Sequence, residues 1–298
     1  MRGRFAPSPT GDLHLGGAYV ALVAHDRVRA QGGGAFVVRM EDLDPPRVVP
    51  GAGARILDDL EWLGLHEDEG LRRGGPHAPY AQSARGAVYA DAIARLEAGG
   101  HVYPCTCSRA EIARASSAPH AGEEGPRYPG TCRDEAKRKP GRPVALRLRV
   151  PDDERRIVSF DDALRGPVRE DVAKAAGDFV LRRGDGVASY QLAVVVDDAA
   201  MEVDEVVRGD DLLASTGRQV LLARLLDVRS PRFVHVPVVR GPDGERLAKR
   251  HQSSVRGTTI HELREAGISA AEVTSELRRG LCDLATPWAP PSRWLERR

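Results

Sequence analysis

The fold is decided by residues 4–17, whose sequence is RFAPSPTGDLHLGG. Arg4–Pro7 is short and extended, and the proline and glycine residues after it predict a strand that runs into a tight loop. Apolar side chains then recur at helical spacing over Gly17–Gln31, so a helix begins directly after this loop. The junction of a strand and a helix presents backbone N–H groups and the positive helix end to an anion. Residues 4–17 therefore predict a nucleotide-binding loop.

The rest of the chain alternates predicted strands and helices. Gly32–Gly34 ends the first helix, and the apolar run Ala35–Met40 predicts a buried second strand. A strand–helix–strand unit of this length implies a parallel sheet. Further helices are expected over Gly53–Leu63, Gln82–Ala98 and Leu212–Leu226, and after Thr258. Further strands are expected over Val144–Val150, Asp178–Arg183, Val187–Leu192, Val194–Val196, Met201–Val207 and Arg232–Val239.

The fold class that follows is α/β, with a Rossmann-type parallel sheet. The stretch Cys105–Arg142 contains clustered Cys and then Ser, Pro and Gly, which predicts an irregular insertion. We therefore expect a catalytic domain over residues 1–250, interrupted by an α+β subdomain over about 101–189. A short helical segment is expected over residues 251–298.

Composition limits the class of protein. The 44 basic and 43 acidic residues give a net charge of +1, which excludes a strongly polybasic nucleic-acid binder but not a local basic face. No apolar window of about 18 residues occurs, and the N-terminus lacks the apolar core of a secretory signal. We therefore expect a cytoplasmic protein with no membrane contact. Lysine is rare in this arginine-rich chain and occurs at Lys137, Lys139, Lys174 and Lys249.

His14, Gly16 and Gly17 carry the strongest functional signal. The two glycines allow a nucleotide to approach the backbone, and His14 can donate a hydrogen bond to phosphate. The whole string resembles the ATP-binding signature of the glutamyl- and glutaminyl-tRNA synthetases of class I. The resemblance implies that His14 and Lys249 are catalytic. The ATP-binding set that it implies is Pro7, Ser8, Pro9, Thr10, Gly11, His14, Gly16, Gly17 and Lys249.

The prefix Arg4-Phe-Ala-Pro-Ser8 resembles the glutamyl branch of that family. A guanidinium binds a carboxylate through two parallel hydrogen bonds and matches an amide poorly, so Arg4 suits a glutamate side chain. By resemblance, Glu41 takes the substrate ammonium, although its acidic run alone could equally be a solvated turn. The implied glutamate-binding set is Arg4, Phe5, Ala6, Pro7, Ser8, Glu41, Tyr190 and Arg208.

Residues 246–250 resemble the mobile lysine loop of class I synthetases in an altered form. Arg246 replaces the first lysine and Ala248 replaces the usual serine, while Lys249 keeps the second lysine. Without the resemblance, the run would indicate only a basic surface stretch. The resemblance implies that Lys249 neutralises the β- and γ-phosphates as pyrophosphate leaves, and such charge contributes about 2.7–4 kcal/mol per donor. The loop comprises Arg246, Leu247, Ala248, Lys249 and Arg250.

Three of the four cysteines lie within 28 residues of one another, which in a cytoplasmic protein favours a metal over a disulfide. Three thiols and a fourth ligand can form a closed tetrahedral zinc site. Cys-x-Cys followed by Tyr-x-x-x-Cys resembles the zinc site of the short glutamyl-synthetase paralogues. The resemblance implies one Zn2+ per chain on Cys105, Cys107, Tyr128 and Cys132. Cys282 is expected to be a small buried apolar residue.

The short C-terminus separates this chain from standard glutamyl-tRNA synthetases. Only residues 251–298 follow the lysine loop, so we expect no anticodon-binding domain. The length, the segment Asp44-Pro-Pro-Arg47 and the Tyr128/Cys132 spacing resemble the glutamyl-Q tRNA(Asp) synthetase family. That resemblance implies a monomeric ligase that activates L-glutamate with ATP and Mg2+. It would transfer the glutamate to queuosine in the anticodon loop of tRNA(Asp).

Two alternatives stay open from the sequence. A truncated glutamyl-tRNA synthetase would charge the 3′ end of a tRNA and would not depend on queuosine. A non-catalytic nucleotide- or RNA-binding relic, suggested by Arg246 and Ala248, would bind ATP without forming an adenylate. Against the relic, the chain retains Arg4, His14, Glu41, Tyr190, Arg208 and Lys249.

Overall fold

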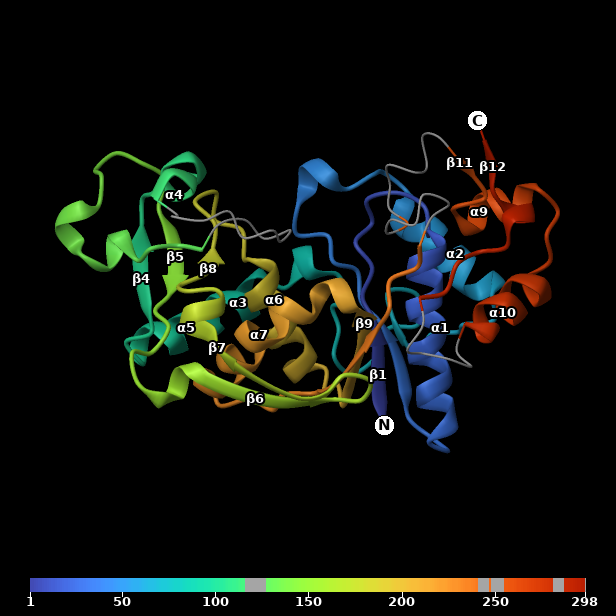
Figure 1. Ribbon diagram of the computed structural model, residues 1–298, viewed down its shortest axis with the longest axis horizontal. Helices are drawn as coiled ribbons and strands as arrows, with labels where there is room; N and C mark the ends of the chain where they lie inside the picture. Colours follow the sequence, from blue (N-terminus) through green and yellow to red (C-terminus); the bar gives the residue numbers. More distant parts are fainter. Residues whose placement is uncertain (116–126, 241–246, 248–254, 281–286, 298) are drawn as a thin grey trace.

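A seven-stranded sheet runs through the computed structural model, which describes residues 1–115, 127–240, 247, 255–280 and 287–297 (Figure 1). The strand order is β3-β2-β1-β9-β10-β6-β7. Neighbours pair in parallel except for β7, which runs antiparallel to β6 at one edge. The expected parallel α/β sheet is confirmed. Its strands are β1 (Arg2–Phe5), β2 (Ala35–Val38), β3 (Glu69–Gly70), β6 (Ile157–Asp162), β7 (Gly166–Asp171), β9 (Glu205–Gly209) and β10 (Arg232–Val236).

Helices cover both faces of this sheet, because its central strands are apolar on both sides. One buried cluster packs the sheet against α1 (Leu15–Ala30), α2 (Ala52–Trp62), α9 (Ile260–Glu265) and α10 (Ala270–Arg279). The other cluster lies against α3 (Gly86–Ala98), α6 (Tyr190–Ala200) and α7 (Leu213–Leu225). Figure 1 shows these two groups on opposite sides of β1 and β9. Short 3₁₀ helices are η1 (Pro45–Arg47), η2 (Gln82–Ala84), η3 (Thr131–Arg133), η4 (Glu135–Lys137), η5 (Glu154–Arg156), η6 (Asp210–Leu212) and η7 (Ser292–Trp294).

The strands expected over Val187–Leu192 and Val194–Val196 are wrong, because most of this region forms helix α6. Ser189 caps the helix, and its side chain accepts the Leu192 N–H at 3.3 Å. All residues from 191 to 198 are buried, so the helix has no polar stripe that would reveal a period of 3.6. A short apolar run of this kind cannot be distinguished from a buried strand by its periodicity.

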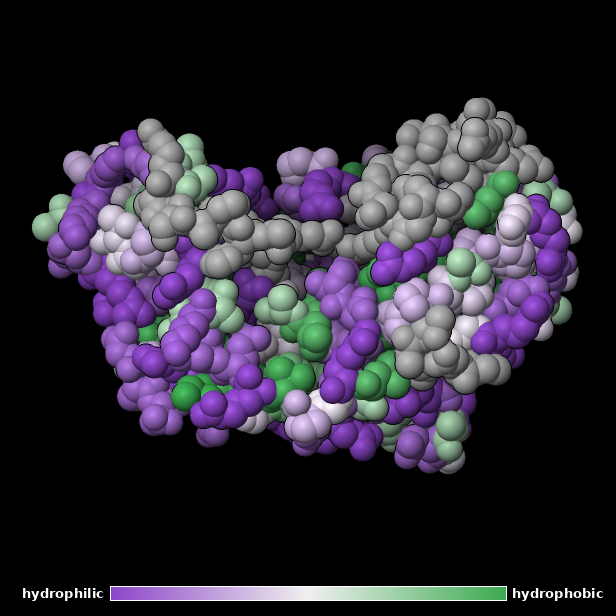
Figure 2. Space-filling model, in the orientation of Figure 1, coloured by the Kyte–Doolittle hydropathy of each residue, from purple (hydrophilic) through white to green (hydrophobic). Residues whose placement is uncertain are grey.

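A separate lobe carries Cys105, Cys107 and Cys132. It is built on an antiparallel sheet of β4 (Val102–Cys105), β5 (Ala145–Leu148) and β8 (Val180–Arg182), with α4 (Arg109–Ala115) and α5 (Val172–Ala175) nearby. The hairpin of β6 and β7 leaves this lobe and joins the main sheet through β10. In Figure 2 the lobe on the left is mostly hydrophilic.

The C-terminal segment packs against α1. The expected helices are present as α9 and α10, and β11 (Val255–Arg256) pairs with β12 (Glu296–Arg297). The Trp288 ring stacks on Tyr19 of α1 with centroids 6.0 Å apart, and Trp294 is buried in the same cluster. Within the described ranges, every helix is too short or too polar to cross a bilayer.

Candidate active site

Charged and polar side chains gather at the carboxyl ends of the central parallel strands. Arg4 lies in β1, Glu41 follows β2, Arg208 lies in β9 and His235 lies in β10. In open α/β sheets this is the edge at which ligands bind. The topology therefore brings β1, the segment after β2, and β9 together at one edge of the sheet.

Backbone hydrogen bonds join the loop after β1 to the segment after β2. The Glu41 N–H donates to the Pro7 carbonyl at 2.9 Å, and the Val49 N–H donates to the Pro9 carbonyl at 2.9 Å. These bonds align the stretch Phe5–Gly11 beside Glu41. Part of the segment predicted to bind ATP therefore lies next to Glu41, which is predicted to bind glutamate.

His14 caps the N-terminus of α1. Its Nδ1 accepts the N–H of Gly17 at 3.0 Å, so a neutral imidazole carries its proton on Nε2, the atom that can donate to an anion. A Cβ on Gly16 would lie 3.2 Å from two ring atoms of His14, so the glycine leaves room for this ring. The next residue, Leu15, donates its N–H to the Thr258 carbonyl at 3.0 Å, so the C-terminal segment supports the motif.

Arg39 is fully buried among three carboxylates. It donates to Asp198 at 2.8 Å and to Glu41 at 3.3 Å, and its Nε lies 3.6 Å from Asp197 Oδ2. Burial opposes the charge of Arg39, but the three carboxylates outweigh it and raise the pKa of this guanidinium. Arg39 therefore stays charged and fixes the position of Glu41.

Asp198 connects Arg39 to Arg4. Its Oδ1 accepts from Arg39 at 2.8 Å and lies 3.4 Å from the Nε of Arg4. Burial would raise the pKa of Asp198, but Arg4 and Arg39 outweigh it and hold the pKa below its usual range. The other hydrogen bond of Arg4 reaches the Val207 carbonyl at 3.4 Å. Both bonds are long, so the protein holds this guanidinium weakly.

Arg208 is a buried cation with neutral partners. It donates to His235 Nε2 at 3.0 Å, to Gln219 Oε1 at 2.8 Å and to Thr216 Oγ1 at 2.7 Å. Its side chain is 4% exposed, and burial lowers its pKa. Among the described residues, none of these hydrogen-bond partners is a carboxylate. Burying a charge without a counter-charge is costly, so the position suits an anionic ligand.

Tyr190 completes the group of predicted glutamate-binding side chains. Burial raises the pKa of its hydroxyl, and Arg208, Glu41 and Arg4 each act on it electrostatically. Arg208 in turn experiences both Tyr190 and Arg4. The structure therefore places Arg4, Glu41, Tyr190 and Arg208 close together, although they are far apart in sequence.

A second layer of polar residues behind the site escaped the sequence analysis. Asp197 accepts from Gln82 at 2.8 Å, from Arg85 at 2.6 Å and from Tyr89 at 2.9 Å, which joins α6 to the start of α3. The spacing of these three donors, three and then four residues apart, is a helical pattern that could have revealed them, although Gln82 lies in η2 and Arg85 is the N-cap of α3. The other residues of this layer are Arg39, Asp198, Thr216, Gln219, His235 and Asp162.

Most of the predicted lysine loop, namely Arg246, Ala248, Lys249 and Arg250, lies outside the described residues. Leu247 is buried, and its N–H donates to the Val239 carbonyl at 2.7 Å. The role of Lys249 stays a prediction. Cys282 also lies outside the described residues.

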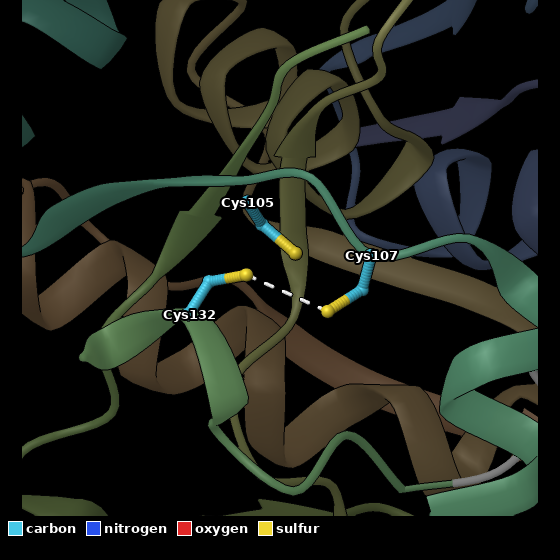
Figure 3. A group of neighbouring side chains, drawn as sticks. All are labelled: Cys105, Cys107 and Cys132. Atoms are coloured by element: carbon cyan, nitrogen blue, oxygen red, sulfur yellow. Dashed lines mark hydrogen bonds between the residues drawn. The ribbon is translucent and has the colours of Figure 1, made fainter. Parts of the chain in front are cut away.

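The sulfur atoms of Cys105, Cys107 and Cys132 point toward a common centre (Figure 3). They lie within 4.8 Å of one another, with 3.5 Å between Cys107 and Cys132. The Tyr128 hydroxyl lies 3.4 Å from the Cys105 sulfur and 3.6 Å from the Cys107 sulfur. Tetrahedral sulfur ligands at about 2.3 Å from zinc would be about 3.8 Å apart, so the spacing of the three thiols is compatible with a metal ion.

Comparison with known proteins decides the family. The model of the class I tRNA synthetases (E and Q), catalytic domain, matches residues 1–282. The chain belongs to this family. This class I synthetase is 48% identical over 297 residues to the glutamyl-Q tRNA(Asp) synthetase of Symbiobacterium thermophilum, covering 97% of this chain and 89% of that protein. It is 49% identical over 283 residues to the glutamyl-Q tRNA(Asp) synthetase of Nitratidesulfovibrio vulgaris, covering 93% of this chain and 85% of that protein.

Solved structures of other synthetases share the fold. A glutamate tRNA ligase from Elizabethkingia meningosepticum, in complex with its amino acid, superimposes with a TM-score of 0.71 at 32% identity. The match covers 85% of this chain and 52% of the ligase, so the synthetase described here spans about half its length. The methionyl-tRNA synthetase of Mycobacterium tuberculosis has a TM-score of 0.60 at 11% identity over 97% of this chain, a likeness of fold alone.

Proposed function

We propose that this synthetase activates L-glutamate with ATP and transfers it to queuosine in the anticodon loop of tRNA(Asp). The observation that carries the substrate is the charge pattern of the site, in which Arg208 has neutral partners and Arg4 is weakly held. The names of the relatives at 48% and 49% identity support the acceptor. The likeness to a glutamate tRNA ligase favours one alternative, the charging of a tRNA 3′ end.

In this proposal the four clustered side chains orient glutamate. Arg4 and Arg208 bind its side-chain carboxylate, Glu41 binds its α-ammonium, and the Tyr190 hydroxyl contacts the substrate between them. A carboxylate satisfies both guanidinium groups, whereas an amide would present N–H donors to them. Sites built from buried charged donors discriminate strongly against ligands that leave those donors unpaired.

The ATP phosphates would bind at the N-terminus of α1, where the Nε2 proton of His14 can donate to them. Mg2+ would accompany ATP, held mainly by phosphate oxygens and water. The α-carboxylate of glutamate attacks the α-phosphorus, and the bond to pyrophosphate breaks. A hydroxyl of queuosine then attacks the glutamyl carbonyl, loses its proton and displaces AMP. The protein contributes mainly position and charge to both steps.

Zinc would be held by Cys105, Cys107, Tyr128 and Cys132, away from the charged edge of the sheet. When bound, it supplies a structural cross-link within the lobe. The proposed glutamate site is built from one chain, so a monomer suffices. We also propose a cytoplasmic location, where ATP and tRNA are present.

Exchange of labelled pyrophosphate into ATP tests the activation step directly. We expect exchange with glutamate and without any tRNA, because the side chains that we propose to bind glutamate all come from this chain. Exchange with glutamine but not with glutamate would refute the substrate assignment. ATP binding with no exchange for either amino acid would favour the non-catalytic relic.

A pair of variants at His14 separates its two roles. The His14→Asn change keeps a side-chain acceptor for the Gly17 N–H, whereas His14→Ala removes it and should cost about 1 kcal/mol of stability. Both changes remove the Nε2 donor, so both should lower kcat for pyrophosphate exchange about tenfold or more. Thermal unfolding and exchange kinetics would measure these effects. Full exchange activity in the stable His14→Asn variant would contradict the proposed phosphate contact.

Removing one metal ligand should empty the zinc site. Purified protein is expected to contain one zinc per chain by elemental analysis, and Cys132→Ser is expected to lose most of it. The lobe should then unfold at lower temperature, because structural zinc contributes folding energy. Cys282→Ser is the matched control, since Cys282 is not one of the four proposed ligands. Equal zinc content in Cys132→Ser and the parent chain would exclude the site.

A further inference from the structure

His235 lies directly behind Arg208 and is fully buried. Its Nε2 accepts the Nε–H of Arg208 at 3.0 Å, and its Nδ1 lies 2.7 Å from Asp162 Oδ2. Since Nε2 accepts, the proton of a neutral ring must be on Nδ1, where it donates to Asp162. The three side chains therefore form a directed chain from carboxylate to imidazole to guanidinium.

Asp162 is itself fixed by the backbone. Its Oδ1 accepts the N–H of Leu164 at 3.0 Å and of Arg165 at 2.9 Å. Its Oδ2 also accepts the His235 N–H at 3.0 Å. The carboxylate at the end of β6 thus has one orientation, which it imposes on the imidazole in the neighbouring strand β10.

The imidazole is neutral in this setting. Burial, together with the charge of Arg208, lowers the pKa of His235 to about 4. A protonated ring would turn a donor toward the Arg208 Nε–H, so the neutral tautomer is the one compatible with the observed contact. The His235 ring thus separates the Asp162 carboxylate from Arg208. The charge of Arg208 therefore has no direct contact with this carboxylate.

We propose that His235 and Asp162 are positioning residues that hold the Arg208 guanidinium in the plane required for a substrate carboxylate, and so help to select glutamate over glutamine. This inference rests on the proposed binding of glutamate by Arg208. Three of the five N–H groups of Arg208 donate to His235, Gln219 and Thr216. Loss of the acceptor at His235 would let the Arg208 guanidinium rotate, and Arg208 would then bind the substrate carboxylate more weakly.

Two substitutions at His235 form a matched test, because each keeps one end of the ring. The Gln side chain can place an oxygen near the Nε2 position and still accept from Arg208. The Asn side chain can place its amide near the Nδ1 position and reaches only Asp162. His235→Asn is therefore expected to raise KM for glutamate about tenfold, with KM for ATP within about twofold of the parent value. His235→Gln should recover most of this loss.

Asp162→Asn provides a second variant. The amide N–H of the new Asn side chain would face Nδ1 of His235, the ring nitrogen that now donates. This forces the ring proton onto Nε2, where the Nε2–H of His235 and the Nε–H of Arg208 would be two donors facing each other. We expect a rise in KM for glutamate like that of His235→Asn and a smaller preference for glutamate over glutamine in pyrophosphate exchange. All variants are compared only as folded proteins with cooperative thermal unfolding.

Failure of the proposed function and failure of the positioning role give different results. A parent chain that shows no exchange with glutamate would remove the proposed function and this inference with it. A parent chain that does exchange, together with equal glutamate KM values in the parent and in His235→Asn, would overturn the positioning role alone. Equal rises in the KM values for glutamate and ATP would also overturn it, because they indicate general disruption.

Discussion

Replacing Arg208 with glutamine is expected to lower kcat/KM for glutamate in pyrophosphate exchange by at least about 10²-fold. The change leaves the substrate carboxylate without one of its two cations in a buried site, and such losses cost about 2–5 kcal/mol. Arg208→Lys keeps the charge but removes the planar fork, so it should recover only part of the activity. KM for ATP should change little, because Arg208 lies at the proposed glutamate end of the site.

The matched control is Arg229→Gln, since Arg229 is an exposed arginine that pairs with Asp204 at the surface. Exposed pairs of this kind contribute about 0–1 kcal/mol, so exchange activity should be preserved. A folded Arg208→Gln variant with near-parental kcat/KM for glutamate would show that Arg208 does not bind the substrate carboxylate.

Replacing Asp197 with alanine is expected to destabilise the protein by about 3–5 kcal/mol. Asp197 is fully buried and accepts from Gln82, Arg85 and Tyr89. Its removal leaves Arg85 without its buried carboxylate. For a chain of this size the change should lower Tm by roughly 10 °C.

Asp91→Ala is the control for this variant, because Asp91 is an exposed residue on the same helix α3. Its effect should stay within about 0.5 kcal/mol. A drop in Tm of only a degree or two for Asp197→Ala would mean that the buried network behind the site adds little to stability.

The parts of the fold that follow from local pattern were predictable. The strand, glycine-containing loop and helix at residues 4–31 show a change of periodicity that the structure reproduces as β1 and α1. The helix α2, the helix α7 and the strand β10 also lie within a few residues of the expected bounds. Each has either one apolar face or clear turn residues at its ends, so neighbouring residues carry the signal.

Helix α6 and the network behind the site were not predictable in the same way. The Val194–Val196 run is apolar because α6 is enclosed by other elements, and enclosure is a tertiary property. Likewise, the partner of His235 is Asp162, which lies 73 residues away in another strand. The likeness of Arg4, Glu41, Tyr190 and Arg208 to a known family indicated the site, but only the fold shows that Asp198 and Arg39 connect Arg4 to Glu41.

In the proposed function, activated glutamate goes to queuosine and not to a tRNA end. The test is the transfer of labelled glutamate to tRNA(Asp) with and without queuosine, using the full chain, ATP and Mg2+. We expect label only on the queuosine-containing tRNA, and we expect it to be retained when the 3′-terminal adenosine has been removed, a change that leaves the diol of queuosine intact. Equal labelling of both tRNAs, or labelling that requires an intact 3′ end, would contradict it.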